Sequence, residues 1–379
     1  MAADSVELVG PDGPGNLANL AGTWGVPVGG KTLFSWDYNE AADELLALYA
    51  KGKQRQWDAE TRLNWDHEVD PDDPLGMPDD FIWIAGSPLW DRLPAADRAV
   101  VRRHTAAWMY SQFLHGEQGA LVCAAKVVQS VPELDAKFYA STQVMDEARH
   151  VEAYNRYLTT KIGLRYGISD ALRGLLDTII SDSRWDFTYL GMQVLIEGLA
   201  LASFSMQRDL MTDPLAKTFN AYVLQDEARH VAFGQIALRR YYRELSGAEL
   251  REREEFAIEA CWALRDRFAG EDMWRTLDYG AEECIQLARR SPAMREFRLR
   301  LFTRILPALR NINLYSPRME AALRKLGVLR FAELNPAEIS ADDERIAAEI
   351  ERIELATRRR EVDVAIADGR WAGGAVPPA

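Results

Sequence analysis

The chain has 379 residues, of which 48% are hydrophobic, and a formal net charge of −13 at pH 7. This composition is typical of a globular protein, and the excess of negative charge argues against binding to nucleic acid or to an anionic membrane surface. The three cysteines show no metal-binding spacing, residues 1–20 lack the features of a secretory signal, and no unbroken apolar run approaches the roughly 18 residues of a membrane span. We therefore expect a reduced, cytoplasmic protein without membrane contact.

The N-terminal part predicts two segments. Residues 1–30 are rich in Gly and Pro, and we expect them to form a flexible arm. Residues 31–94 predict a helix over about 40–56, followed by an acidic, proline-containing loop that wraps on the rest of the protein. His67 lies in this loop, and its many acidic neighbours favour a solvated segment over a metal site.

Residues 95–245 predict the central unit, an all-α four-helix bundle. Its long helices are expected over about 95–129, 133–161, 185–211 and 214–245, with a connecting helix near 170–182. Pro132 and Asp213-Pro214 mark two of the boundaries. Nowhere does a period of two persist, so we expect no strands.

The helical pattern continues to the C-terminus. Residues 246–335 predict a helical extension packed on the bundle, with helices over 248–269, 276–290 and 294–314. Residues 336–379 predict a charged peripheral helix over 341–367 and then a disordered tail. An apolar seam on that peripheral helix suggests a contact within a homodimer.

One pattern occurs twice in the bundle. The sequence Asp-Glu-Ala-Arg-His-Val spans residues 146–151 and recurs at 226–231, and a lone glutamate precedes the glutamate of each copy by 30 residues, at Glu117 and Glu197. Residues i and i+3 share a helical face, so the Glu and His of each copy project the same way. Four carboxylates and two imidazoles at matching positions are the ligand inventory of a dinuclear metal site.

Charge and surroundings support this interpretation. The helical neighbours of Glu117 and Glu197 are apolar, and a bare carboxylate is costly to bury there. Two divalent cations would neutralise four carboxylates, and carboxylate with imidazole suits iron or manganese better than a thiolate-preferring metal. A single Glu-x-x-His is usually a surface pair, but two copies with a glutamate at the same offset favour the metal site.

The remaining charged residues of the two repeats suggest a supporting shell. Asp146 and Asp226 are expected to orient the imidazoles by accepting the ring N–H that does not bind metal, with Arg149 and Arg229 holding each aspartate. The alternative for these residues is a set of solvent-facing ion pairs at helical spacing.

These residues resemble the ferritin-like di-iron carboxylate superfamily. The Asp-Glu-x-Arg-His form is most similar to the hydroxylase α subunits of bacterial multicomponent monooxygenases, and it also resembles the small subunit (R2) of ribonucleotide reductase. The similarity covers roughly residues 100–245. It implies a pair of irons cycling between Fe2+ and Fe3+, with an Mn/Fe pair left open, and some bridging carboxylates. The implied ligands are Glu117, Glu147 and His150 for one iron and Glu197, Glu227 and His230 for the other.

Three positions bear on the type of chemistry. Tyr154 lies four residues after His150, where R2 proteins hold a tyrosyl radical, so it is the candidate catalytic residue; the alternative is an ordinary buried aromatic. Multicomponent monooxygenases commonly have a threonine where this chain has Leu201. The p-aminobenzoate N-oxygenase family has a third histidine where this chain has Val223, and we take this difference as evidence against that family.

The expected function is that of an O2-activating non-haem di-iron oxygenase, a hydroxylase or monooxygenase. It would act on a small organic substrate with electrons from a separate reductase or ferredoxin. Two alternatives stay open at this point. One is an R2-like protein that generates a radical or oxidises metal, and the other is a ferritin-like iron-handling protein without an organic substrate.

Overall fold

The computed structural model describes residues 6–7, 24–36, 38, 43–266 and 268–368. Most of the expected N-terminal arm, residues 1–5 and 8–23, and the expected tail, residues 369–379, lie outside the described residues. The division of the chain into five segments therefore stays a prediction.

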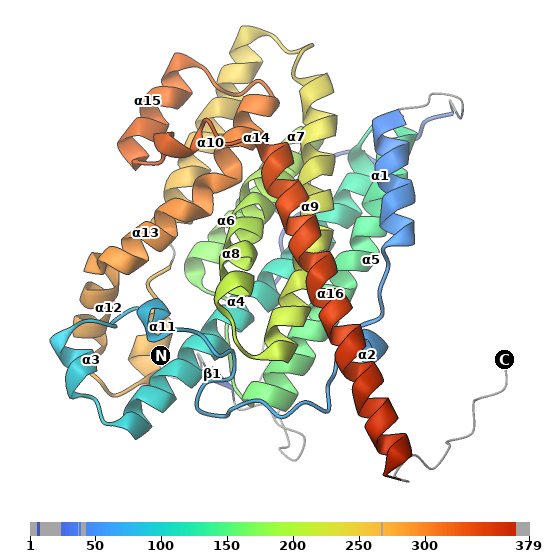
Figure 1. The fold of residues 1–379 in the computed structure, drawn as a ribbon. Coiled ribbons are helices and arrows are strands. Elements are labelled where there is room, and N and C mark those ends of the chain that lie inside the picture. The colour runs from blue at the N-terminus through green and yellow to red at the C-terminus, as the bar shows by residue number, and fades with distance from the viewer. Residues whose placement is uncertain (1–5, 8–23, 37, 39–42, 267, 369–379) are drawn as a thin grey trace.

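The centre of the molecule is a bundle of long helices. They are α4 (Ala95–Ser130), α5 (Leu134–Tyr157), α8 (Glu197–Leu210) and α9 (Pro214–Tyr241). Helix α4 packs along α5, α8 packs along α9, and α5 contacts α9 to join the two pairs (Figure 1). This confirms the all-α, ferritin-like bundle, and the helix boundaries lie within a few residues of those expected.

Local sequence explains where several of these helices begin. The Asp213 side chain accepts a hydrogen bond from the backbone N–H of Ala216, and Pro214 occupies the first turn of α9. Ser169 caps the connecting helix α6 (Asp170–Ser181) in the same way through Leu172. Such caps satisfy backbone donors that a helix leaves unpaired, and each contributes about 1 kcal/mol.

The third long helix is irregular just before the metal-site glutamate. Helix α7 (Trp185–Tyr189) passes into the π-helical segment η4 (Leu190–Ile196), and α8 then begins at Glu197. A second π-helical segment, η3 (Leu158–Ile162), follows α5. Single π turns are rare and occur often at functional sites. On α9, Gly234 lets η4 approach closely, because a Cβ there would lie 2.6 Å from Cβ of Gln193.

The same irregular helix is long and strongly apolar. Among the described residues, one helical run, Trp185–Leu210, is long and apolar enough by those two criteria to cross a membrane. Its most apolar window is 94% buried inside the protein, as expected for the core helix of a bundle.

The expectation of no strands is wrong in one place. Strand β1 (Val6–Glu7) pairs antiparallel with β2 (Arg165–Tyr166), with Val6 opposite Tyr166 and Glu7 opposite Arg165. Two residues are too few to show any period, and the partners lie far apart in the sequence, so no local pattern could reveal this pairing.

The segment before the bundle is more ordered than a wrapping loop. It contains α1 (Asp43–Gln54), α2 (Ala59–Arg62), η2 (Asp79–Phe81) and α3 (Pro88–Arg92). Helix α1 packs against α5 and α9, and four tryptophans of this segment are buried in the core, namely Trp57, Trp65, Trp83 and Trp90. His67 contacts the bundle, because its Nε2 lies 2.7 Å from Oδ2 of Asp213.

The C-terminal extension is helical as expected, but its helices are shorter. The elements are α10 (Gly247–Asp266), α11 (Glu271–Thr276), α12 (Ala281–Arg290), α13 (Pro292–Arg300), η5 (Leu301–Thr303), α14 (Ile305–Asn311), α15 (Pro317–Leu326) and η6 (Leu329–Phe331). The expected helix over 276–290 is delayed to Ala281, after Gly280 adopts a left-handed φ of 78°. The expected helix over 294–314 is broken at η5.

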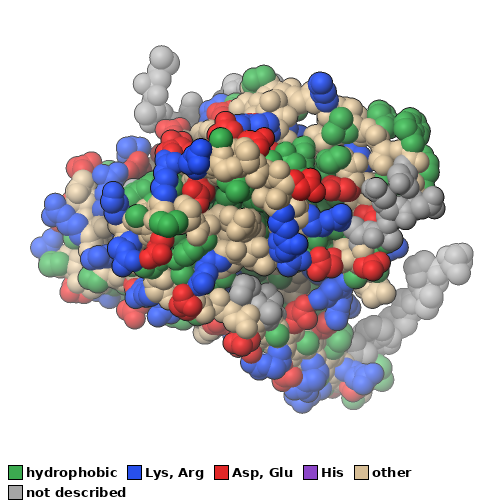
Figure 2. Space-filling view, turned by 90° about the horizontal axis from the view of Figure 1, so that it is seen from above, with side chains coloured by type: hydrophobic (Ala, Val, Ile, Leu, Met, Phe, Trp, Pro, Cys, Tyr) green, Lys and Arg blue, Asp and Glu red, His purple; other side chains and the backbone are tan. Residues whose placement is uncertain are grey.

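The last helix, α16 (Pro336–Ala367), crosses α9 on the outside of the bundle (Figure 1). Its buried Asp343 accepts hydrogen bonds from Arg208 at 3.0 Å and from Arg304, which fixes the helix on the bundle. On the face drawn in Figure 2, basic and acidic side chains are intermixed and do not form one patch of a single sign.

Candidate metal centre

The bundle brings all six expected ligands together in its interior. Glu117 comes from α4, Glu147 and His150 from α5, Glu197 from the start of α8, and Glu227 and His230 from α9. Glu117 is 6% exposed and the other five are at most 2% exposed. Burial of four carboxylates at one place requires compensating positive charge.

The ligand atoms form two adjoining groups. One atom each from Glu117, Glu147, His150 and Glu227 lies within 4.8 Å of the others, and the same holds for Glu147, Glu197 and His230. The two groups share Glu147, so the geometry is that of two neighbouring metal positions. The role of these six residues as metal ligands stays a prediction.

Two of the glutamates lie between the histidines. Nδ1 of His150 is 3.4 Å from Glu147 and 3.3 Å from Glu227. Nδ1 of His230 is 3.1 Å from Glu147 and 3.6 Å from Glu227. The resemblance left open which carboxylates bridge; these distances favour Glu147 and Glu227, with Glu117 and Glu197 at the two ends.

The donor set fits a pair of metal ions. Nε2 of His150 lies 3.0 Å from Asp226, and Nε2 of His230 lies 3.2 Å from Asp146. If each Nε2–H donates to its aspartate, each Nδ1 keeps a lone pair that faces carboxylate oxygens. Acceptors so close repel one another unless a cation lies between them, and atoms that bind a metal at about 2.1 Å lie roughly 3 Å apart.

Buried atoms without partners point to the same conclusion. Several ligand atoms of the cluster are among the buried side-chain atoms that have no hydrogen-bond partner in the described part of the chain: Oε2 of Glu147, Oε2 of Glu197, both carboxylate oxygens of Glu227, and Nδ1 of His230. Buried polar atoms are rarely left unpaired, and here all are potential metal ligands. The buried Glu/His cluster is therefore able to bind metal ions.

Electrostatics in the metal-free site favour bound protons. Burial, followed by repulsion from Glu227, raises the pKa of Glu117 and of Glu197 well above the ordinary value. Burial alone would lower the pKa of His150 and His230, but the neighbouring glutamates outweigh it, so both pKa values are raised. A divalent cation must displace these protons, so metal uptake releases them.

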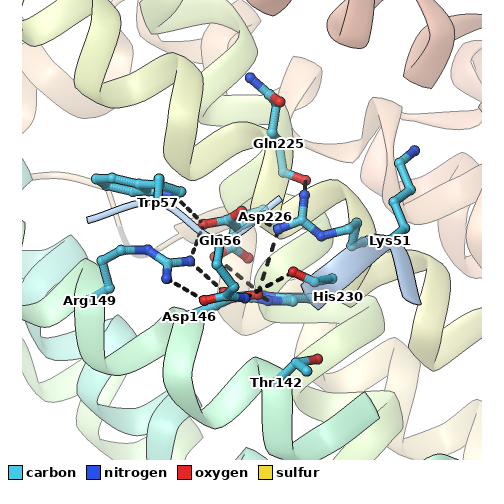
Figure 3. A network of polar contacts seen from close by, with 12 residues as sticks. Lys51, Gln56, Trp57, Thr142, Asp146, Arg149, Gln225, Asp226 and His230 are labelled. Carbon is cyan, nitrogen blue, oxygen red and sulfur yellow. Dashed lines mark hydrogen bonds and ion pairs between the residues drawn. The ribbon is translucent and has the colours of Figure 1, made fainter. Parts of the chain in front are cut away.

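The two aspartates are held in one network that crosses the repeats (Figure 3). Arg149 donates to Asp146 and, at 2.9 Å, to Asp226, while Arg229 donates to Asp226. The aspartate of each repeat serves the histidine of the other. All four of these charged residues are buried, so they are not solvent-facing ion pairs. Burial would raise the pKa of Asp226, but Arg229, His150 and Arg149 outweigh it and hold that pKa below its usual range.

Two residues of this network were not anticipated. Trp57 Nε1 donates to Asp226 at 2.8 Å, and Gln56 Nε2 donates to Asp146 at 2.8 Å while its carbonyl accepts from Arg149 at 2.7 Å (Figure 3). Both lie between α1 and α2, and no spacing in the sequence links them to α5 or α9.

Gln143 is a further polar contact to the ligands. Its Nε2 donates to Glu147 at 3.0 Å and to Glu197 at 2.8 Å. It precedes Glu147 by one helical turn, so helical spacing alone places it on the face of α5 that carries the ligands. Its two bonds hold one bridging and one terminal carboxylate in position.

Tyr154 lies in a cluster of aromatic rings beside the centre. Its ring centroid is 5.3 Å from that of Tyr110 and 4.6 Å from that of Phe219. Burial raises its pKa, and the charge of Glu117 adds to this effect. The position is near the ligands, and a redox role for Tyr154 stays a prediction.

A bundle with this buried carboxylate–histidine cluster defines a ferritin-like protein of the di-iron carboxylate class. Residues 36–313 match the family model described as p-aminobenzoate N-oxygenase AurF. The match covers most of the chain and all six expected ligands, so the chain belongs to this family and is a non-haem di-iron oxidoreductase.

Two further comparisons were made. A search of curated proteins found no match. Among solved structures, the chain is similar to a mutant of an R2-like ligand-binding oxidase with an anaerobically reconstituted Mn/Fe cofactor. That similarity has 16% sequence identity and a TM-score of 0.44, and it covers 74% of this chain and 95% of the other.

The superfamily resemblance is thus confirmed, but the argument from Val223 against the p-aminobenzoate N-oxygenase family is wrong. Val223 is fully buried on α9, one turn before Glu227, and its side chain belongs to the hydrophobic core. One ligand position differs from the family, whereas the pattern of residues 36–313 as a whole matches the family model. The chain is therefore a family member with an apolar side chain at that position.

Proposed function

We propose that this di-iron oxygenase transfers one atom of O2 to a nitrogen atom of a small organic amine, with two electrons from a separate reductase or ferredoxin. The observation that carries the proposal is the pair of ligand groups that share Glu147 in a buried bundle core. We infer an amine substrate from the name of the family. We infer an electron donor because the reaction needs two electrons to balance. One oxygen atom enters the substrate, and the other leaves as water with two protons and two electrons.

The chain supplies a rigid holder for the metals. Glu117, Glu147, His150 and Glu227 would hold one iron, and Glu197 and His230, with Glu147 shared, would hold the other. A ferrous pair bound there would supply the electrons that begin the reduction of O2. By accepting from Nε2–H of the two imidazoles, Asp146 and Asp226 would leave each Nδ1 free to hold a metal ion. Arg149 donates to both aspartates and Arg229 donates to Asp226, and the aromatic rings around Tyr154 exclude water.

The test combines stoichiometry and isotope labelling. Protein loaded anaerobically with ferrous iron is exposed to 18O2 with a chemical reductant and a panel of aromatic amines. We expect two irons per chain and one labelled oxygen atom in the product. An absence of labelled product with every amine and every reductant would contradict the proposal.

One observation favours a second candidate, an R2-like radical protein. Tyr154 lies one helical turn after His150, and the charge of Glu117 contributes to the raised pKa of Tyr154. The same sample, frozen after O2 addition, would then show a stable tyrosyl signal by electron paramagnetic resonance, and Tyr154→Phe would abolish it. Uptake of many irons per chain would instead favour iron handling.

We also propose a homodimer that contacts through α16. Its residues Ile353 and Leu355 are 52% and 51% exposed, and such a contact would bury them. Sedimentation of the chain and of an Ile353→Lys variant tests this. The cytoplasmic location stays a prediction.

A further inference from the structure

A narrow apolar cavity lies beside the metal centre. The space that the centre of a water-sized sphere can reach is about 20 Å³, so an aromatic ring enters only if side chains of the lining move; the empty space between the side chains, including the part that opens to solvent, is about 480 Å³. Aromatic rings make up half of its lining, those of Phe81, Trp83, Trp108, Phe113, Phe268 and Phe297. Three methionines add flexible side chains that can shift to admit a flat ring, namely Met77, Met109 and Met294. Such a lining favours an aromatic ligand.

The ring of Phe113 lies between the cavity and the metal centre. Phe113 lines the cavity and precedes Glu117 on α4 by one helical turn, about 6 Å along the axis. Its ring centroid lies 4.8 Å from that of Phe204 and 5.8 Å from that of Tyr154. An aromatic layer therefore separates the cavity from the ligands, and a molecule in the cavity lies about one turn from Glu117.

Two polar atoms of the lining have no partner. Nε1 of Trp108 and Oε1 of Gln207 are buried, and neither has a hydrogen-bond partner among the described residues. Trp108 is 3% exposed and Gln207 is 1% exposed. The Nε2 of Gln207 donates to Ser203 at 2.8 Å, which fixes the amide and leaves its carbonyl as an acceptor. The cavity thus offers one donor and one acceptor to a guest, and buried groups of this kind seldom stay unpaired.

The cavity offers no positive charge. Its polar lining residues, within the described part of the chain, are Gln112, Ser203 and Gln207. Gln112 is already engaged, because its amide donates to Gly167 and accepts from Ser169. Arg102 lines an adjoining cavity, but its guanidinium binds both carboxylate oxygens of Asp79 at 2.7 and 2.9 Å. A carboxylate in this cavity would therefore be buried without a counter-ion.

We propose that this cavity is the substrate pocket and that it selects a neutral aromatic amine with a second, uncharged polar group. That group would accept from Trp108 and donate to Gln207. The inference rests on the proposed oxygenase function, and it sets this chain apart from a p-aminobenzoate N-oxygenase in the literal sense, because p-aminobenzoate is an anion.

The test uses two probes of nearly equal shape. Protein loaded with ferrous iron is kept anaerobic, so that no turnover occurs, and titrated by calorimetry with 4-aminobenzamide or with 4-aminobenzoate. We expect the neutral amide to bind at least roughly 30-fold more tightly than the carboxylate. Equal binding, tighter binding of the carboxylate, or no binding of either probe would overturn the proposal.

Substitutions locate the binding. Gln207→Met nearly keeps the size of the side chain and removes the polar atoms, whereas Trp108→Phe removes the ring N–H together with part of the ring; each should weaken binding of the amide about tenfold. Binding of 4-methylaniline, which lacks the amide, should change little. The matched control is Gln193→Met, since Gln193 is also a buried glutamine with unpaired amide atoms but does not line the cavity. An unchanged amide affinity in Gln207→Met would overturn the proposed contact.

The outcomes separate the pocket from the chemistry. Since binding is measured without O2, selective binding of the amide without any labelled product would sink the oxygenase and keep the neutral pocket. Labelled product from other amines, without selective binding, would do the opposite. Melting temperature and iron content of each variant confirm that the fold is intact.

Discussion

The metal centre and the apolar cavity both bury polar atoms, but those atoms are crowded together in the first and isolated in the second. At the metal centre, carboxylates, imidazoles and arginines are crowded, and Asp226 alone lies within hydrogen-bond distance of Trp57, Arg149, Arg229 and His150. In the cavity, two polar atoms stand apart in an apolar lining. The first arrangement holds charge rigidly in place, and the second can recognise an uncharged guest.

The largest expected effect is at the bridging glutamates. Glu147→Ala removes a carboxylate that faces both histidines at 3.1 and 3.4 Å, so both metals should be lost. Iron per chain after anaerobic loading measures this. Glu152→Ala, an exposed position on the same helix, is the control and should keep two irons. Retention of both irons by Glu147→Ala would show that the centre is misassigned.

The network behind the histidines should have the next largest effect. Asp226→Asn keeps the shape but removes the charge that pairs with Arg149 and Arg229, so metal affinity should fall by about 10- to 100-fold. Competition with a chelator measures the affinity. Trp57→Phe removes a single neutral donor to Asp226, so its affinity should stay within a few-fold of the original. Equal effects of the two substitutions would mean that charge is not what the network supplies.

This contrast also explains what the sequence could predict. The repeated Glu-x-x-His and the glutamate before each copy predicted which six residues would gather in the core, because helical spacing alone decides which side chains share a face. Helix starts followed from Asp213, Pro214 and Ser169. The contact of Trp57 with Asp226 could not be foreseen, since it depends on how a segment outside the bundle folds over it. The cavity is likewise formed by side chains from several segments, and no spacing in the sequence relates those segments to one another.

The pH dependence of stability should differ with and without metal. Glu117 and Glu197 have raised pKa values, so above the ordinary value of 4.5 the folded chain binds more protons than the unfolded chain and loses stability as pH rises. His150 and His230 also have raised pKa values, and their contribution is lost as pH rises through the folded value, above the ordinary 6.5. The metal-free protein should therefore melt at lower temperature as pH increases from about 5 to 8.

Bound iron should reverse that trend, because metal ligands must be deprotonated and rising pH then favours binding. Asp226, whose pKa is lowered, adds a loss of stability only as pH falls below its ordinary 3.8, outside this range. Melting curves of chelated and iron-loaded protein at the same pH values make the comparison. A metal-free melting temperature that rises with pH would show that the carboxylates are not protonated in the empty bundle.

The smallest expected effect lies in the cavity, and it has the opposite sign. Gln207→Met removes a buried carbonyl that has no partner among the described residues, so the metal-loaded fold should be unchanged or more stable by up to about 1 kcal/mol. Ser203 loses the donor that Gln207 now supplies, which limits the gain. By contrast, Asp226→Asn should destabilise the loaded protein, because Arg149 and Arg229 stay buried while one of the negative charges that pair with them is removed. Urea unfolding of the two variants measures both changes. If Gln207→Met lost as much stability as Asp226→Asn, the carbonyl of Gln207 would be needed for folding. The distinction between a rigid charged centre and a cavity with unpaired polar atoms would then fail.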